Sequence, residues 1–361
     1  MQKHNSNFRS RTDDCTHERF HSRTRKEVRD FLAIPPTHAI PLKKPLGIKK
    51  TLKWVHNNKA PGPDNINVNT LKPMPKKGFT HITKLFNTSL RLHHFPESFR
   101  KVHITMIPKP QKDPLIPQNY RPISLLDHAG KILERIMLKR LDTHVKHLIP
   151  DTQFAFRGEH STTLQLFRFI DDTTTRFLNR EHTTAVFFDI EKAFDSVWYM
   201  GLIKKLINGG VPDAYIKQIK SYLQDRTYRA KYETKLSTSH PMKAGVPQGS
   251  VLAPTLFNIY MADIPKHPKT KIAQYADDTA IYITNKDINT NTSKLQAHII
   301  KLSTWFSKWR IKLNTDKTSA ITFTKRFTQN VTPLIINNTP LEYKNQIKYL
   351  GLTLDKKTNL Q

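Results

Sequence analysis

The sequence predicts an α+β fold, and three observations support this prediction. Strand-like runs rich in branched and aromatic residues alternate with amphipathic helical segments along the chain. The 361 residues, 37% of them hydrophobic, are enough for one large domain or two lobes with a substantial core. No internal repeat is apparent. We therefore expect sheets with helices packed against one face.

The N-terminal half opens on a segment with little apolar periodicity. Residues 1–50 are polar and basic and then proline-rich, so we expect partial disorder with some helix near 25–32. Residues 59–64 form a dense proline–glycine turn signal. The elements predicted next are a helix at 80–93, a strand at 102–107, a proline-broken loop at 109–120, and helices at 126–145 and 162–178.

The C-terminal half alternates strands and helices more regularly. The predicted order is a strand at 185–188, a helix around 202–207 ended by Gly209 and Gly210, a helix at 213–223, a hairpin at 227–242, a helix around 252–260, a hairpin at 271–284, a helix at 292–309, a strand at 319–324, and short strands near 334–337 and 347–354.

Two adjacent carboxylates, Asp277 and Asp278, lie at the tip of the hairpin predicted at 271–284. A third, Asp189, follows the strand-like run at 185–188. An isolated Asp–Asp pair is usually an ordinary turn. However, like charges at a strand turn are unfavourable unless a cation neutralises them. Three carboxylates at the ends of neighbouring strands can hold two divalent metals, an arrangement that displaces one phosphate oxygen by another.

The charge balance points to a polyanionic partner. Formal net charge is +30, from 59 Lys and Arg against 29 Asp and Glu. Counterion release from nucleic acid would be the main source of affinity. A membrane surface is a weaker interpretation, because the basic residues are spread along the whole chain. No apolar run approaches the length of a membrane span.

The number of cysteines limits which disulfides and metal sites the chain can form and indicates its redox environment. The single cysteine, Cys15, excludes an internal disulfide and a cysteine-based zinc knuckle. The N-terminus lacks the apolar core of a signal peptide. We therefore expect a reducing, intracellular setting, in the nucleus and cytoplasm.

Six short sequence blocks occur in a fixed order along the chain. They are NYRPISLL at 119–126, QFAFR at 153–157 with HST at 160–162, FDIEKAFD at 188–195, GVPQGS at 245–250, YADD at 275–278, and YLG at 349–351. Each block alone is weak, but the ordered set is specific. It resembles the reverse transcriptase of non-LTR (LINE-type) retrotransposons, and within those the jockey-like mobile elements, from about residue 50 onwards.

This resemblance implies a right-hand polymerase with fingers and palm. It assigns residues 1–50 to a basic extension, 51–185 to the fingers with the start of the palm, and 186–361 to a palm ending at a primer-grip-like hairpin. The palm sheet would be antiparallel and backed by helices. The thumb is missing after the hairpin, and nothing before residue 50 resembles an endonuclease, so we expect a fragment or one reading frame of a decayed element.

The resemblance also implies a catalytic centre. Asp189, Asp277, Asp278 and the backbone carbonyl of Ile190 would hold two Mg²⁺ ions, for which Mn²⁺ could substitute. One ion would activate the primer 3′-hydroxyl, and the other would bind the triphosphate and the leaving pyrophosphate. Lys317 resembles a lysine that protonates the pyrophosphate; an ordinary surface lysine is the alternative.

Five residues are implied to bind the nucleotide. Lys109 and Arg121 resemble the fingers cations that hold the triphosphate, although Lys109 could be a solvated loop cation. Phe194 resembles the ring that excludes a 2′-hydroxyl, with simple packing as the alternative. Gln248 and Gly249 resemble the turn that approaches the nascent base pair, with a plain helix-entry turn as the alternative.

Contacts to the nucleic acid itself are implied at two places. Arg157 is expected to contact the template strand. Tyr349, Leu350 and Gly351 resemble the hairpin that grips the primer end.

The predicted function is RNA-directed DNA polymerase, with an RNA template, a DNA primer and deoxynucleoside triphosphates as partners. A truncated, inactive nucleic-acid-binding remnant is one alternative. A reverse transcriptase of another class, such as a group II intron maturase, is another. Trp305 and Trp309 are expected to pin their helix to the sheet rather than to stack on bases.

Overall fold

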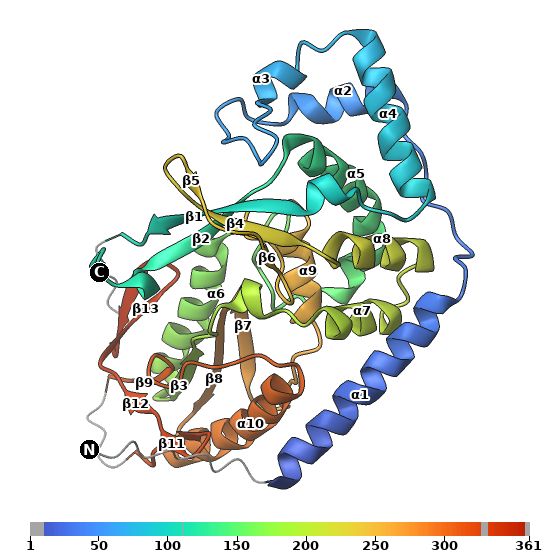
Figure 1. Ribbon diagram of the computed structural model, residues 1–361. Coiled ribbons are helices and arrows are strands. Elements are labelled where there is room, and N and C mark those ends of the chain that lie inside the picture. Colours follow the sequence, from blue (N-terminus) through green and yellow to red (C-terminus); the bar gives the residue numbers. More distant parts are fainter. Residues whose placement is uncertain (1–10, 111, 326–330, 358–361) are drawn as a thin grey trace, which may run out of the picture.

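Two five-stranded β-sheets and a helical layer between them organise the chain in the computed structural model, which describes residues 11–110, 112–325 and 331–357 (Figure 1). The predicted α+β class is confirmed. Helices and strands alternate, and the two sheets are built from different parts of the chain.

The N-terminal segment forms a long helix, α1 (Arg11–Ala33). It is longer than the short helix expected near 25–32, because no glycine or proline interrupts it and it ends just before two prolines. Within its described part, Val28 and Thr24 are buried, and Phe20 packs edge-on against Trp309 with ring centroids 5.5 Å apart. The described part of residues 1–50 is thus more helical than expected, and the expectation of partial disorder in this segment stays a prediction.

A small helical layer follows α1. It contains α2 (Pro45–Lys53), α3 (Val68–Leu71), α4 (Lys76–Arg91) and the 3₁₀ turn η1 (Glu97–Arg100). Only α4 was predicted. Both α2 and α4 place one apolar face inward, with Ile48, Leu52 and Phe86 buried.

The N-terminal sheet has the strand order β2-β1-β4-β5, with β6 also paired to β4. Its strands are β1 (Lys101–Pro108), β2 (Tyr120–Leu125), β4 (Thr227–Tyr232), β5 (Lys235–Leu236) and β6 (His240–Pro241), and the turn η2 (Pro117–Asn119) leads into β2. The strand β2 was not predicted, since Pro122 argues against a central strand. At the edge of the sheet that proline is tolerated.

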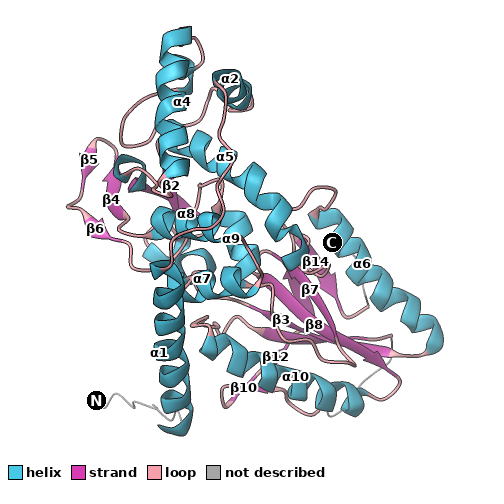
Figure 2. Ribbon diagram, turned by 90° about the vertical axis from the view of Figure 1, so that its right-hand side faces the viewer, coloured by secondary structure: helices cyan, strands magenta, loops and turns pink. Residues whose placement is uncertain are grey.

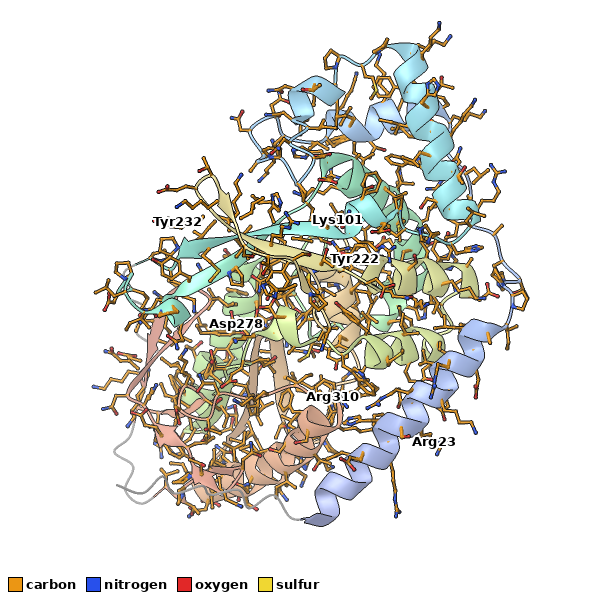
Figure 3. The ribbon with its side chains drawn as sticks, in the orientation of Figure 1. Arg23, Lys101, Tyr222, Tyr232, Asp278 and Arg310 are labelled. Carbon is orange, nitrogen blue, oxygen red and sulfur yellow. The ribbon has the colours of Figure 1, made fainter. Side chains whose placement is uncertain are left out.

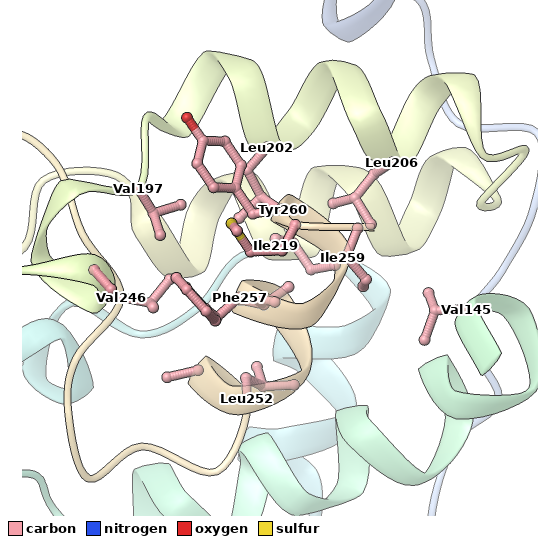
Figure 4. Packing of buried hydrophobic residues seen from close by; sticks show 14 of the residues in the cluster. Val145, Val197, Leu202, Leu206, Ile219, Val246, Leu252, Phe257, Ile259 and Tyr260 are labelled. Carbon is pink, nitrogen blue, oxygen red and sulfur yellow. The ribbon is translucent and has the colours of Figure 1, made fainter. Parts of the chain in front are cut away.

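Helices from both halves of the chain pack between the sheets. They are α5 (His128–Val145), α7 (Tyr199–Asn208), α8 (Asp213–Leu223) and α9 (Ala253–Tyr260), with the short turns η3 (Lys146–Leu148) and η5 (Ala193–Ser196). Helix α9 is the most buried of them. Figure 4 shows Phe257 and Ile259 of α9 close to Leu202 of α7 and Ile219 of α8, in one buried cluster.

The C-terminal sheet has the strand order β12-β9-β3-β8-β7. Its strands are β3 (His182–Phe188), β7 (Lys271–Tyr275), β8 (Asp278–Asn285), β9 (Ser319–Phe323) and β12 (Glu342–Tyr343). Pairing is antiparallel except between β12 and β9. The boundary expected between residues 185 and 186 falls inside β3, the central strand.

Both faces of this sheet are covered, not one as expected (Figure 2). All seven residues of β3 are buried, and they alternate between two cores: Ala185 and Phe187 face one, Val186 and Phe188 the other. The elements on the first face are α6 (Thr162–Thr174), η4 (Thr175–Asn179) and the hairpin of β13 (Gln346–Tyr349) and β14 (Leu352–Asp355). Those on the second are α10 (Ile288–Lys308) and the hairpin of β10 (Ile335–Ile336) and β11 (Thr339–Pro340). Within the described ranges, no helix is long and apolar enough for a membrane span.

Candidate functional site

The three predicted carboxylates lie at the same end of the C-terminal sheet. Strands β7 and β8 pair up to Tyr275 and Asp278, so Ala276 and Asp277 form a two-residue loop. Phe188 of β3 pairs with Thr279 of β8, and Asp189 therefore leaves its strand beside Asp278. Figure 3 shows Asp278 near the middle of the molecule, between the two sheets. We call residues 275–278 the carboxylate turn.

Burial and neighbouring negative charge raise the pKa values of Asp277 and Asp278. Partial burial, followed by the charges of Asp277 and Asp189, raises the pKa of Asp278 to about 6. Burial also raises the pKa of Asp277, and Asp189 adds to the shift while Arg121 of β2 opposes it. The negative charges are thus close enough to destabilise one another. Arg121, one of the two cations predicted to hold the triphosphate, is close enough to lower the pKa of Asp277.

The donor set suits a hard cation such as Mg²⁺, since carboxylate oxygens are its preferred protein ligands. Repulsion among three carboxylates is the cost that such a cation removes. However, in the part of the chain that the structure describes, no group of three or more His, Cys, Asp or Glu side chains is gathered tightly enough to hold an ion. The residues fit the metal in chemistry, and ion binding requires their side chains to move closer together.

The backbone around Asp189 is held by the loop after α10. The Asp189 N–H donates to Thr318 Oγ1 at 3.2 Å, and the Asn314 N–H donates to the Asp189 carbonyl at 2.8 Å. Ile190 forms an isolated bridge with Leu313. The backbone of Asp189, at the end of β3, is therefore held by the segment that leads into β9. Strand β9 pairs with β3 on the side away from β8.

A pocket of about 280 Å³ opens beside the carboxylates. Asp189, Asp278 and Lys317 line it, so the predicted proton donor lies next to the carboxylates, and its side chain is exposed. Two further lysines, Lys344 and Lys348, line the same pocket. Neither lysine was among the predicted site residues, although both lie within five positions before YLG. The pocket can attract an anionic phosphate.

The block GVPQGS forms a second turn, residues 245–250, which we call the proline–glycine turn. Gly249 has φ +118°, and a Cβ there would lie 2.7 Å from the Ser124 carbonyl oxygen of β2. The Ser124 N–H donates to the Gln248 carbonyl at 2.7 Å, and the Gln248 side chain bonds to Asp195. Close backbone approach explains the glycine; contacts of Gln248 and Gly249 with a nucleotide stay a prediction.

A buried carboxylate that the sequence analysis missed holds this second turn. Glu134 of α5 is 1% exposed, and its Oε2 accepts hydrogen bonds from Ser250 Oγ and Val251 N–H, both at 2.7 Å, and from Leu252 N–H at 3.1 Å. These donors lie at the start of α9, where a negative charge is favourable. An acidic residue between Leu133 and Ile136 on the apolar stripe of a helix was the available signal.

Phe194 packs against aromatic side chains. Its ring stacks on Phe257 of α9, with centroids 4.6 Å apart and planes 18° apart, and meets Phe156 edge-on. The packing alternative is therefore realised in part. Exclusion of a 2′-hydroxyl by the partly exposed ring stays a prediction.

Two predicted cations are engaged within their own loops. Lys109 Nζ donates to the Gln118 carbonyl at 3.0 Å. Arg157 Nη1 donates to the carbonyls of Pro150 and Gln153, at 2.9 and 3.1 Å, and its side chain is only 17% exposed. Among the described residues, no contact joins either cation to the carboxylates, and their roles toward triphosphate and template stay predictions.

The YLG block is the turn of the hairpin β13–β14. Tyr349 is buried, and its hydroxyl accepts a hydrogen bond from Gln165 of α6 at 3.3 Å. Leu350 and Gly351 have φ of +47° and +93°, as a tight hairpin loop requires. Tyr349 lines the pocket beside the carboxylates, which places this hairpin at the same site.

Trp305 and Trp309 are buried, as predicted for core residues. They enclose the ammonium of Lys205, which lies 3.9 Å from the Trp309 ring centroid and pairs with Asp263. Burial lowers the pKa of Lys205 to about 8. These contacts join α7 to α10 beneath the sheet.

Comparison with known proteins gives a consistent result. The family described as "Reverse transcriptase (RNA-dependent DNA polymerase)" matches residues 107–354. Two relatives from Drosophila melanogaster are each 35% identical over 92% of this chain: the probable RNA-directed DNA polymerase from transposon BS, over 38% of its length, and that from mobile element jockey, over 37%. The apo telomerase of Candida tropicalis, truncated from its C-terminal domain, superposes with a TM-score of 0.49 at 12% identity over 80% of this chain and 60% of that chain. That last likeness is too loose to support an argument.

The chain spans less than two fifths of the length of these two curated relatives. The family match contains all three carboxylates, Lys317 and both turns.

Proposed function

Because the chain belongs to the reverse transcriptase (RNA-dependent DNA polymerase) family, we propose that it is the polymerase part of a non-LTR retrotransposon. It would add deoxynucleotides to a primer 3′-hydroxyl on an RNA template. The relatives named as polymerases of transposon BS and jockey support the assignment to this class over a group II intron maturase.

One observation carries the proposal: the carboxylates of Asp189, Asp277 and Asp278 converge at one sheet end, beside a pocket lined by lysines. Negative side chains alone would repel a nucleotide, and lysines alone would bind phosphate without chemistry. Together they suit a site in which metal ions and a triphosphate are held side by side.

When bound, two Mg²⁺ ions would supply charge neutralisation and activation of the 3′-hydroxyl, held by the three carboxylates and the Ile190 carbonyl. Arg121 would contact the triphosphate, and Lys317 would deliver a proton to the leaving pyrophosphate. Phe194 and the proline–glycine turn would border the nucleotide sugar. In this scheme the N-terminal sheet belongs to the fingers and the C-terminal sheet to the palm.

The test is primer extension on poly(rA)/oligo(dT) with Mg²⁺. Asp277→Asn removes one negative ligand with little change in volume, and it should abolish incorporation while duplex binding stays nearly unchanged. Asp30→Asn, an exposed carboxylate on α1, is the matched control and should behave as the unmodified chain. Extension by Asp277→Asn at the unmodified rate would refute the catalytic assignment.

The inactive-remnant alternative has a separate outcome in the same experiment. Binding of the duplex without incorporation by the unmodified chain would favour it. Binding that weakens steeply with salt is expected in both cases, since the net charge is +30.

A further inference from the structure

We propose that Gln153 is a positioning residue for the catalytic carboxylates, because its side-chain amide holds the carboxylate turn in a backbone conformation that the turn's own sequence does not favour. This inference rests on the proposed function, since it assigns Gln153 a part in that reaction. Gln153 lies in the QFAFR block, where no role was assigned to it.

The contact pairs one amide with one residue's backbone. Gln153 Oε1 accepts from the Ala276 N–H at 2.9 Å, and Gln153 Nε2 donates to the Ala276 carbonyl at 3.3 Å. Both residues are buried, at 1% and 6% exposure. The side chain thus replaces the two ladder bonds that Ala276 cannot make inside a two-residue loop.

Ala276 needs this support. Its φ is +55°, in the left-handed region. Tight hairpin loops use Gly, Asn or Asp there, because glycine has no Cβ and the short polar side chains bond to nearby backbone. Alanine has neither advantage, so a neighbouring group must stabilise the conformation. Asp277 follows directly, and the direction of its side chain depends on that backbone.

Gln153 itself is held in place by three further contacts. Its Oε1 also accepts from the Ala155 N–H at 3.0 Å. The Phe154 N–H donates to the Gln274 carbonyl at 2.9 Å, so this segment runs beside β7 as a parallel bridge. Arg157 Nη1 donates to the Gln153 carbonyl. Because these contacts already order the Gln153 side chain, its hydrogen bonds to Ala276 cost little further conformational entropy.

The chemistry of the contact requires glutamine. Ala276 presents one donor and one acceptor, and an amide offers the matching acceptor and donor. A glutamate in the same place would face the Ala276 carbonyl with a second acceptor, and it would add a fourth negative charge near Asp277 and Asp278. Glutamine and glutamate have nearly the same shape. Gln153→Glu therefore removes the hydrogen bond to the Ala276 carbonyl while leaving the packing of the side chain unchanged.

The experiment compares variants of the full chain in primer extension. Gln153→Ala and Gln153→Glu should each lower kcat by about 10- to 100-fold and raise the Mg²⁺ concentration at half-maximal rate, with KM for the nucleotide changed less than about threefold. Gln218→Ala is the matched control. Gln218 is equally buried and bonds Ser89 Oγ at 3.2 Å, away from the carboxylates. It should lose stability yet keep kcat; an equal fall in kcat there would overturn the proposal.

A double variant gives the sharpest arm. Glycine adopts positive φ without steric cost, so Ala276→Gly should need the Gln153 contact less. We expect Gln153→Ala/Ala276→Gly to recover at least about tenfold of the rate lost in Gln153→Ala. Absence of any recovery would overturn the proposal, because a purely packing role of Gln153 predicts that outcome.

A readout independent of activity separates this proposal from the proposed function. Hydrogen–deuterium exchange of the peptide covering residues 272–281 should accelerate at least about tenfold in Gln153→Ala, and much less in Gln218→Ala. If the unmodified chain extends no primer but this acceleration is seen, the proposed function fails and the turn contact stands. If exchange in Gln153→Ala is unchanged, the turn contact fails whatever the activity.

Discussion

The carboxylate turn and the proline–glycine turn lie in the same site but are held by opposite kinds of side chain. Neutral Gln153 pairs with the backbone of Ala276 in the first turn. Charged Glu134 accepts three hydrogen bonds at the end of the second. Both side chains are 1% exposed, and both come from segments far from the turns in sequence.

Local charge explains the difference. The carboxylate turn already carries repelling negative charges, and a neutral amide stabilises its backbone without adding another. The proline–glycine turn leads into α9. The carboxylate of Glu134 accepts from the Val251 and Leu252 N–H groups just before that helix, where its negative charge interacts favourably with the helix dipole. The electrostatic field at each turn therefore determines whether a neutral or a charged side chain can stabilise it.

The largest expected effect is the loss of stability when Glu134, which holds the proline–glycine turn, is replaced. Glu134→Ala leaves three donors without an acceptor and should lower the free energy of unfolding by about 4 kcal/mol, and Glu134→Gln by about 2 kcal/mol, because one neutral acceptor remains. Urea denaturation followed by circular dichroism measures both. Unchanged stability of Glu134→Gln would show that the charge is not needed at this turn.

A second prediction concerns the glycines. Gly249→Ala combines a positive φ with a Cβ placed 2.7 Å from the Ser124 carbonyl oxygen, and it should cost about 3 kcal/mol of stability. Gly210→Ala is the control. Gly210 also has a positive φ, +68°, but nothing lies within 4 Å of its added Cβ, so we expect about 1 kcal/mol. Thermal denaturation distinguishes them, and equal losses would contradict the close approach to β2.

The smallest expected effect is the pH dependence of stability that arises from Asp278 in the carboxylate turn. The pKa of Asp278 is raised to about 6 in the folded chain, above its usual 3.8. The folded state therefore holds its proton more tightly, and metal-free stability falls as pH rises between these values. Because the side chain reaches solvent, we expect a loss of only about 1 kcal/mol by pH 7.5.

Asp278→Asn should remove that part of the pH dependence. Unfolding free energies in EDTA at about pH 4 and 7.5 measure it, and Mg²⁺ should stabilise the unmodified chain more than the variant at the higher pH. Parallel pH profiles for the two proteins would contradict the repulsion inferred among the carboxylates.

Much of the fold could be predicted because its elements carry strong periodicity. The apolar stripe of α5 and the branched strands β3 and β8 fall close to their expected residues. Helix α1 was underestimated because its core-facing stripe is narrow and polar residues dominate its composition. Strand β2 was missed because Pro122 masks a strand that lies at a sheet edge.

The site was predictable only in part, for a different reason. The carboxylates belong to two of the six sequence blocks, and Lys317 lies outside the blocks but matches a lysine that the resemblance implies. Asp189, Asp278 and Lys317 line one pocket, and Asp277 lies in the adjoining turn. The contact of Gln153 with Ala276 joins residues 123 positions apart, and no local pattern encodes it. The template contact expected of Arg157 stays a prediction, and the hydrogen bonds of its guanidinium to two carbonyls of its own loop follow from no local sequence pattern.

The central place of β3 has a consequence for biosynthesis. Both of its partners, β8 and β9, lie later in the chain, and about 90 residues separate the end of β3 from the start of β8. A ribosome adding roughly 5–20 residues per second needs on the order of 5–20 seconds to cover that interval. During this interval β3, all of whose residues are buried in the folded chain, has no partner strand. The chain order therefore leaves β3 without a strand partner until β8 has been synthesised.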